Sequence, residues 1–214
     1  ITVDGGAQHA DGAGSAALHP LGEVVSPPLV DVLAYLVQRS DNHLADAVFR
    51  TIGAAGGDAT WAGAARHATD ALARLGVDTA GFALADGSGL SRLGRATPRA
   101  LVDLDELMTR SPFAAAWSSF YAVAGSSGTL RSRLAGTPAA GVVAGKTGSL
   151  RDVRALAGYV TDGSRVRFRF SVVGNDLDRP GLDAVERAQD EIAVALAERA
   201  LACAGMAECP AVGP

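Results

Sequence analysis

The strongest constraint on the fold is a period of two in the last third of the chain. Across 166–173, apolar residues alternate with arginine and serine, which predicts a strand with one buried face. Apolar segments at 142–144 and 156–160 predict two earlier strands, and the Asp-Gly pair at 162–163 is typical of a hairpin turn. Helical spacing of apolar residues follows over 181–202. The sequence therefore predicts an antiparallel meander followed by a terminal helix.

The residues before the meander have the end signals of helices. Ser26 followed by two prolines predicts an N-cap and first turn for a helix that ends near Arg39. Ser40-Asp41-Asn42 precedes a second helix, so this tripeptide is expected in the turn between two helices. Similar signals predict further helices over 58–75 and 97–108, a short strand over 82–84 and a turn over 86–89. The expected fold class is α+β, an antiparallel sheet with helices packed on its faces.

Composition excludes several classes of protein. The 214 residues are 48% hydrophobic and 20% charged, which is enough apolar material for one core. A net charge of -4 offers no basic surplus for a phosphate backbone, so no nucleic-acid partner is expected. No segment approaches the roughly 20 consecutive apolar residues of a transmembrane helix. No residue spacing predicts a metal site, and no motif predicts a cofactor.

The two ends of the chain bear on where the protein works. The first residues lack the charged-then-apolar pattern of a signal peptide, and a strand-like start at Ile1 favours a piece of a longer protein. Cys203 and Cys209 are close enough in sequence to close a short disulfide loop, but a bonded pair and two free thiols both remain open. The cysteines mildly favour an exported protein.

One residue type is used only once. Of the 19 basic residues only Lys146 is a lysine, and it lies in Gly145-Lys146-Thr147-Gly148-Ser149 after an apolar strand. A buried lysine amine can lose its proton, whereas an arginine cannot, so a site that needs a tunable proton donor retains lysine. The alternative is an arginine-biased coding sequence with one lysine left over.

Two tripeptides occur in a known order, and longer blocks surround them. Ser40-Asp41-Asn42 and Lys146-Thr147-Gly148 are two of the three signatures of class A β-lactamases and penicillin-binding proteins. The blocks Ser26–Leu29, Ser40–Asp46, Asp86–Arg92, Gly128–Arg131 with Arg133, Lys146–Leu150 and Leu156–Val160 extend the match. From about Ser26 to about Asn175 the chain resembles class C low-molecular-mass penicillin-binding proteins, which are D-alanyl-D-alanine carboxypeptidases and endopeptidases. The resemblance implies a β-lactamase/transpeptidase-like fold.

The resemblance implies a role for each matching residue. Ser40 would relay a proton to the departing D-alanine amine, paired with Lys146 as the charged donor. Asn42 would donate its amide to the substrate carbonyl. Thr147 would bind the terminal carboxylate and Gly148 would let the peptide lie along the strand edge, while the backbone N–H of Ser149 would form half of an oxyanion hole.

The chain departs from this family in its first motif. The family's nucleophile lies in Ser-x-x-Lys, where one helical turn sets a lysine amine beside the serine as its base. Because Lys146 is the only lysine, no serine here has a lysine three residues later. Residues 1–214 are therefore expected to be the C-terminal part of one penicillin-binding domain. It is expected to be inactive alone, with the nucleophile in a missing N-terminal half.

The same residues are compatible with less specific roles. Ser40-Asp41-Asn42 could be only a helix cap, and the sequence ties none of the histidines His9, His19, His43 and His67 to a catalytic acid. A β-lactamase or esterase of the superfamily shares the chemistry. A noncatalytic module that binds peptidoglycan or a protein through a degenerate penicillin-binding fold also accounts for the missing motif. The first hypothesis remains an exported cell-wall peptidase with peptidoglycan peptides and β-lactams as partners and no cofactor.

Overall fold

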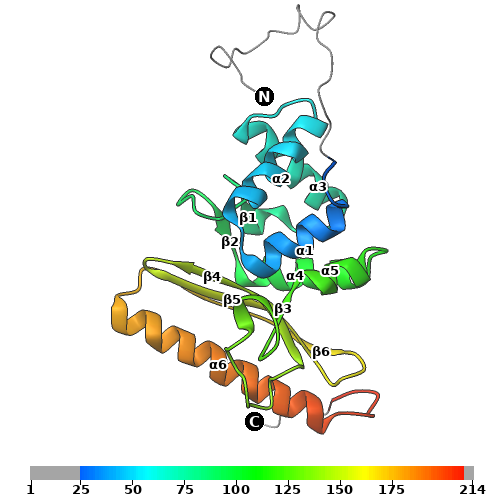
Figure 1. Ribbon diagram of the computed structural model, residues 1–214, viewed down its shortest axis with the longest axis vertical. Helices are drawn as coiled ribbons and strands as arrows, with labels where there is room; N and C mark the ends of the chain where they lie inside the picture. Colours follow the sequence, from blue (N-terminus) through cyan, green and yellow to red (C-terminus); the bar gives the residue numbers. More distant parts are fainter. Residues whose placement is uncertain (1–24, 210–214) are drawn as a thin grey trace, which may run out of the picture.

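The computed structural model of the protein describes residues 25–209, so the strand-like start at Ile1 lies outside the described part. Figure 1 shows a sheet with one long helix on one face and the remaining helices on the other. The long helix is α6 (Arg179–Ala202). The helices opposite it are α1 (Leu29–Arg39), α2 (Asn42–Ala55), α3 (Trp61–Arg74), α4 (Pro98–Thr109) and α5 (Ala114–Phe120). This arrangement confirms the predicted α+β class.

The main sheet has the strand order β3-β4-β5-β6, and all its pairs are antiparallel. The predicted meander is confirmed as β4 (Val143–Leu150), β5 (Val153–Thr161) and β6 (Val166–Gly174). A hairpin turn joins β5 to β6 at Asp162-Gly163, as predicted, and the Asp162 carboxylate accepts from the Ser164 and Arg165 amides. A separate small sheet pairs β1 (Phe82–Ala83) with β2 (Arg95–Ala96).

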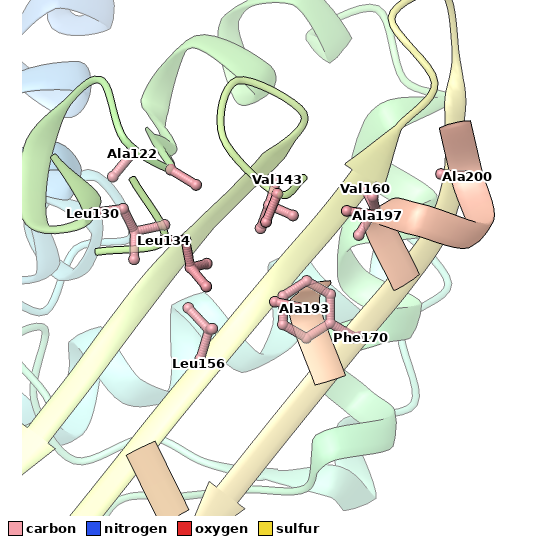
Figure 2. Close-up of a cluster of buried hydrophobic side chains, with 12 residues drawn as sticks. Ala122, Leu130, Leu134, Val143, Leu156, Val160, Phe170, Ala193, Ala197 and Ala200 are labelled. Carbon is pink, nitrogen blue, oxygen red and sulfur yellow. The ribbon is translucent and has the colours of Figure 1, made fainter. Parts of the chain in front are cut away.

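The α6 face of the sheet carries the main core. Alternation along the strands places Val143, Leu156 and Phe170 on this face, where Leu156 is 0% and Phe170 6% exposed. Figure 2 shows these side chains beside small residues of α6, namely Ala193, Ala197 and Ala200. Alanines at these positions let the helix approach the sheet closely, so this half of the molecule is densely packed.

The opposite face of the sheet carries polar and aromatic side chains. Tyr159 of β5 contacts Tyr121, with ring centroids 5.7 Å apart. Arg169 of β6 donates to buried Asp105 of α4 at 3.0 Å. Lys146 of β4 is the register partner of Ala157, which is two residues from Tyr159. The side chains of Lys146 and Tyr159 therefore project from the same face of the sheet, the one opposite α6.

One edge of the sheet is open beside Lys146. Strand β3 (Ala122–Val123) pairs only with Ala144 and Gly145 of β4. Beyond Gly145, no other described strand pairs with this side of β4. The segment Lys146–Leu150 therefore offers backbone groups to an added strand.

The start of α1 differs from the prediction. Its N-cap is Pro28, at ψ 143° and without a side-chain cap, and Ser26 caps nothing. Because Pro28 follows Pro27, the ring of Pro28 holds Pro27 in extended backbone, and the helix begins only after both prolines. The other predicted helices start within a few residues of the expected positions, with Thr60, Thr97 and Asp178 as N-caps.

The two cysteines, which the sequence left open, are bonded. Cys203 and Cys209 form a disulfide with Cα atoms 5.4 Å apart. Arg167 of β6 donates to the carbonyls of Cys203 and Met206 at 2.6 and 2.8 Å, and pairs with Asp162 at 2.5 Å. The disulfide loop is therefore tied to the β5–β6 hairpin.

Candidate functional site

Ser40-Asp41-Asn42 lies in the turn between α1 and α2, as predicted. Asp41 is the N-cap of α2, and its carboxylate accepts from the Leu44 amide at 3.0 Å. Ser40 ends α1 in left-handed backbone with φ 56° and ψ 49°, a conformation that costs a serine about 1 kcal/mol. Helix capping therefore accounts for Asp41, and the Ser40 hydroxyl is left for another contact.

That contact is with Lys146, which is 106 residues away in sequence. The Lys146 ammonium donates to Ser40 Oγ at 2.8 Å and to the Thr147 carbonyl at 2.6 Å. Burial lowers the pKa of Lys146 below its ordinary value of 10.5. The pair therefore joins a hydroxyl to an ammonium that loses its proton more readily than a solvated lysine does.

Close approach of β4 and β5 sets the position of Lys146. A Cβ on Gly158 would overlap the Ala144 carbonyl oxygen, so only glycine fits there. Gly158 belongs to the block Leu156–Val160 and is the register partner of Gly145, the residue before Lys146. Gly158 thus allows β4 and β5 to remain hydrogen-bonded beside Lys146, whose side chain projects toward the helices opposite α6.

Thr147, Gly148 and Ser149 continue along the open edge. The Thr147 hydroxyl bonds the Thr129 hydroxyl at 2.8 Å. Gly148 is half-buried and Ser149 is exposed. The sequence assigned Thr129 no role, although it lies in the block Gly128–Arg131.

The loop at Asp86–Gly89 forms part of the rim. Asp46 of α2 accepts from the Gly87 and Ser88 amides at 3.0 and 2.9 Å, which holds the loop against the helix. A Cβ on Gly87 would overlap the Ala45 carbonyl oxygen, so this contact requires glycine. The sequence did not predict the role of Asp46, because its partners lie more than 40 residues away.

These segments surround one cavity of about 390 Å³. Of the predicted site residues, Ser40, Asn42, Lys146, Thr147 and Gly148 line it, and exposed Ser149 follows them on β4 without contributing to the lining. Apolar side chains supply much of the remaining wall, namely Leu36, Val37, Leu101, Leu104, Trp117 and Tyr121. The cavity thus joins a small polar corner to an apolar and aromatic wall, as substrate sites commonly do.

A buried carboxylate holds the aromatic wall. Asp105 is 2% exposed, and its two oxygens accept from Trp117 Nε1 at 2.9 Å and Arg169 Nε at 3.0 Å. Burial, reinforced by Asp105, raises the pKa of Tyr121 well above its ordinary value of 10.0. Trp117 and Tyr121 are therefore fixed by one network that joins α4, α5 and β6.

Other chemistries find less support in the described residues. His43 is exposed and His67 packs against Gly56, and neither of these two described histidines lines the cavity. Between residues 25 and 209, no cluster of three or more His, Cys, Asp or Glu side chains could hold a metal ion. Within the same range, no helix is long and apolar enough to cross a membrane.

The fold and the paired motifs define a penicillin-binding, transpeptidase-like class of protein. Residues 1–198 match the D-Ala-D-Ala carboxypeptidase 3 (S13) family, and the chain belongs to this family. It is 41% identical over 186 residues to a D-alanyl-D-alanine carboxypeptidase of an Actinomadura species, covering 84% of this chain and 34% of that protein. It is 35% identical over 176 residues to carboxypeptidase DacB of Mycolicibacterium smegmatis, covering 78% of this chain and 38% of that protein.

Solved structures agree with this assignment. Penicillin binding protein 4 of Haemophilus influenzae, solved in complex with a β-lactam, superposes with a TM-score of 0.69 at 27% identity. That match covers 78% of this chain and 42% of the other. A predatory endopeptidase of Bdellovibrio bacteriovorus shares the fold, with a TM-score of 0.66 at 20% identity over 81% of this chain and 44% of its own. The chain spans little more than a third of the length of the two carboxypeptidases.

Proposed function

We propose that this chain forms two walls of the active site of a serine-type D-alanyl-D-alanine carboxypeptidase or endopeptidase that acts on peptidoglycan peptides. The observation that carries the proposal is the 2.8 Å contact between Lys146 Nζ and Ser40 Oγ. The contact joins the two motifs across 106 residues of sequence, inside a cavity that the rest of both motifs also lines. Family membership supports the same reaction class.

The pair is suited to proton transfer toward a leaving amine. In the proposed reaction, a serine oxygen attacks the carbonyl carbon of the penultimate D-alanine, and the serine proton passes to a lysine base. The bond to the terminal D-alanine nitrogen then breaks, and that nitrogen takes a proton through the Ser40 hydroxyl, with Lys146 as its donor. Water afterwards hydrolyses the acyl-serine ester.

The remaining residues would bind and orient the peptide. The open edge at Lys146–Leu150 allows the substrate to add as an antiparallel strand, with Gly148 leaving room beside it. Thr147 would bind the terminal carboxylate, Asn42 the substrate carbonyl, and the Ser149 amide the oxyanion. β-Lactams carry the same amide and carboxylate groups and would acylate the same serine.

The nucleophile and its base belong to a part of the protein that this chain does not contain. No lysine other than Lys146 is present, so the Ser-x-x-Lys motif would lie N-terminal to Ile1. We assign residues 1–214 to the C-terminal part of that one penicillin-binding domain. A peptidoglycan substrate requires export, which the Cys203–Cys209 disulfide supports.

A hydrolysis assay tests the proposal. The complete gene product should release D-alanine from a peptide that ends in D-Ala-D-Ala. Lys146→Ala should lower kcat/KM by about 10²-fold or more, because the proton donor is lost. Arg187→Ala removes a cation from exposed α6 on the other face of the sheet and should leave the rate unchanged. Peptidoglycan binding without any hydrolysis would support the noncatalytic module instead.

A further inference from the structure

The turn η3 (Gly128–Leu130) lies between the end of α1 and strand β4 and contacts both. Its middle residue, Thr129, is exposed, and its hydroxyl lies 2.8 Å from the Thr147 hydroxyl. Its first residue, Gly128, packs on α1, since a Cβ there would lie 2.7 Å from the Gln38 carbonyl oxygen. Gln38 is two residues before Ser40. One short turn thus sets the spacing between the end of α1 and the edge of β4.

Buried contacts hold this turn in place. Leu130 is 0% exposed within the sheet core. Arg133, three residues on, donates to Asp190 at 2.6 Å and to Gln189 Oε1 at 2.9 Å, which anchors the segment on α6. Gly128 adopts φ 53°, which a larger side chain rarely does. Thr129 is therefore presented to Thr147 from a rigid support rather than from a mobile loop.

One hydrogen bond joins the two hydroxyls, and Thr147 donates it to Thr129. Each threonine carries one O–H proton, and the bond between them engages one of the two. The other remains free for an acceptor in the cleft. When an anion accepts from Thr147, the two hydroxyls would rotate, so that Thr129 donates to the Thr147 oxygen and polarises its O–H, because neighbouring hydrogen bonds strengthen one another. Without Thr129, the Thr147 hydroxyl loses both this donor and its fixed rotamer.

We propose that Thr129 is a positioning residue that aims the Thr147 hydroxyl at the terminal carboxylate of the substrate. The inference rests on the proposed function, because it deepens the role of Thr147 in that site. It assigns recognition of the free carboxylate to a pair of hydroxyls from β4 and η3. Specificity for a peptide with a free C-terminus would then depend on a residue outside both signature motifs.

Kinetics of the complete gene product test the pair. Thr129→Val should raise KM for a D-Ala-D-Ala peptide by about fivefold with kcat changed less than about twofold, because ground state and transition state both carry the carboxylate. Thr129→Ser keeps the hydroxyl and should restore KM to within about twofold of the wild type. Acylation by benzylpenicillin, which also carries a carboxylate, should slow by a similar factor in Thr129→Val.

A second ligand separates positioning from structural support. The same peptide with a C-terminal carboxamide serves as a competitor of acylation by benzylpenicillin. It should inhibit acylation of the wild type and of Thr129→Val equally well. Thr51→Val removes a hydroxyl that bonds only the Ala47 carbonyl of its own helix, and it is the matched control that should change nothing. If Thr129→Val loses its thermal transition, Thr129→Ala takes its place.

The outcomes discriminate the inference from the proposed function. An active wild type with KM unchanged in Thr129→Val overturns the inference and leaves the function intact. Equal weakening of carboxylate and carboxamide peptides also overturns it, since the defect would then be structural. A wild type that neither hydrolyses the peptide nor is acylated overturns the proposed function, and the inference with it.

Discussion

The two sides of the cavity are built differently. The sheet with α6 has a continuous core, in which Leu130, Leu156 and Val160 are fully buried. Helix α1 on the other side has no buried residue, and Leu29 and Tyr35 are 64% and 55% exposed. Lys146 therefore projects from a rigid support, while Ser40 lies at the end of a helix with uncovered apolar side chains.

This contrast makes one side of the site depend on the rest of the protein. A strand in a packed sheet fixes a functional side chain by itself, whereas a helix fixes one only when its apolar face is covered. The proposed N-terminal part would supply both the nucleophile and the cover for α1. The Lys146 side should then be preformed, and the Ser40 side should become ordered with the complete domain.

The largest effect should come from matched phenylalanines on the two sides. Phe170→Ala in the sheet core should lower the free energy of unfolding by about 4 kcal/mol, because a dense core cannot collapse into the cavity. Phe49→Ala in α2 should cost about 3 kcal/mol, because its ring neighbour Trp61 is 46% exposed and can move into the space that the ring leaves. Chemical denaturation of this chain measures both. Equal losses would show that the two sides are packed alike.

The next effect concerns the link between the sides. Asp105→Ala should destabilise by about 3 kcal/mol, because it leaves the Trp117 N–H and the Arg169 guanidinium without their buried acceptor. Asp103→Ala, on the same helix, removes only an exposed ion pair with Arg99 and should cost less than about 0.5 kcal/mol. Thermal unfolding of the two variants compares them, and similar costs would refute the linking role of Asp105.

The preformed side should also be visible in the pH dependence. Burial lowers the pKa of Lys146 below 10.5. Its ammonium form is therefore lost, as the pH rises, earlier than that of a solvated lysine. A reaction that needs the protonated amine should therefore have an alkaline limb in kcat/KM below pH 10.5. Tyr121 does not account for such a limb, because burial raises its pKa well above 10.0 and out of that pH range. A limb at or above the ordinary lysine pKa would contradict the role of Lys146 as proton donor.

The smallest effect should be on the Ser40 side. Ser40→Gly relieves the left-handed strain that Ser40→Ala retains, so the glycine variant should be more stable than the alanine variant by up to about 1 kcal/mol. Both variants lack the hydroxyl and should be equally impaired in turnover. Denaturation midpoints and turnover rates, measured on the same samples, test both expectations. A glycine variant less stable than the alanine variant would mean that Ser40 carries no backbone strain.

Much of the fold followed from periodicity. The meander, the hairpin turn at Asp162 and the terminal helix have long, regular patterns, and the structure agrees with them. Helix α5 was missed because its seven residues, Ala114–Phe120, are too few to display a helical period, and Phe113 gives no side-chain cap. Strand β3 has two residues and no pattern that a sequence could reveal.

The sequence predicted part of the cavity lining and none of its geometry. Both signature tripeptides line the cavity, but the apolar and aromatic wall that includes Leu36, Trp117 and Tyr121 was not predicted. The roles of Asp46 and Thr129 depend on partners that only the tertiary fold brings near, since each uses an ordinary side chain with no local signal. The left-handed conformation of Ser40 was likewise hidden, because serine does not favour it.

The most direct test of the proposed function is mass spectrometry of the complete gene product after incubation with benzylpenicillin, with this chain treated in parallel. We expect one acyl adduct, mapped to a serine N-terminal to Ile1 within a Ser-x-x-Lys motif, and no adduct on this chain alone. No adduct on the complete gene product, or an adduct on any serine of these 214 residues, would contradict the proposed function.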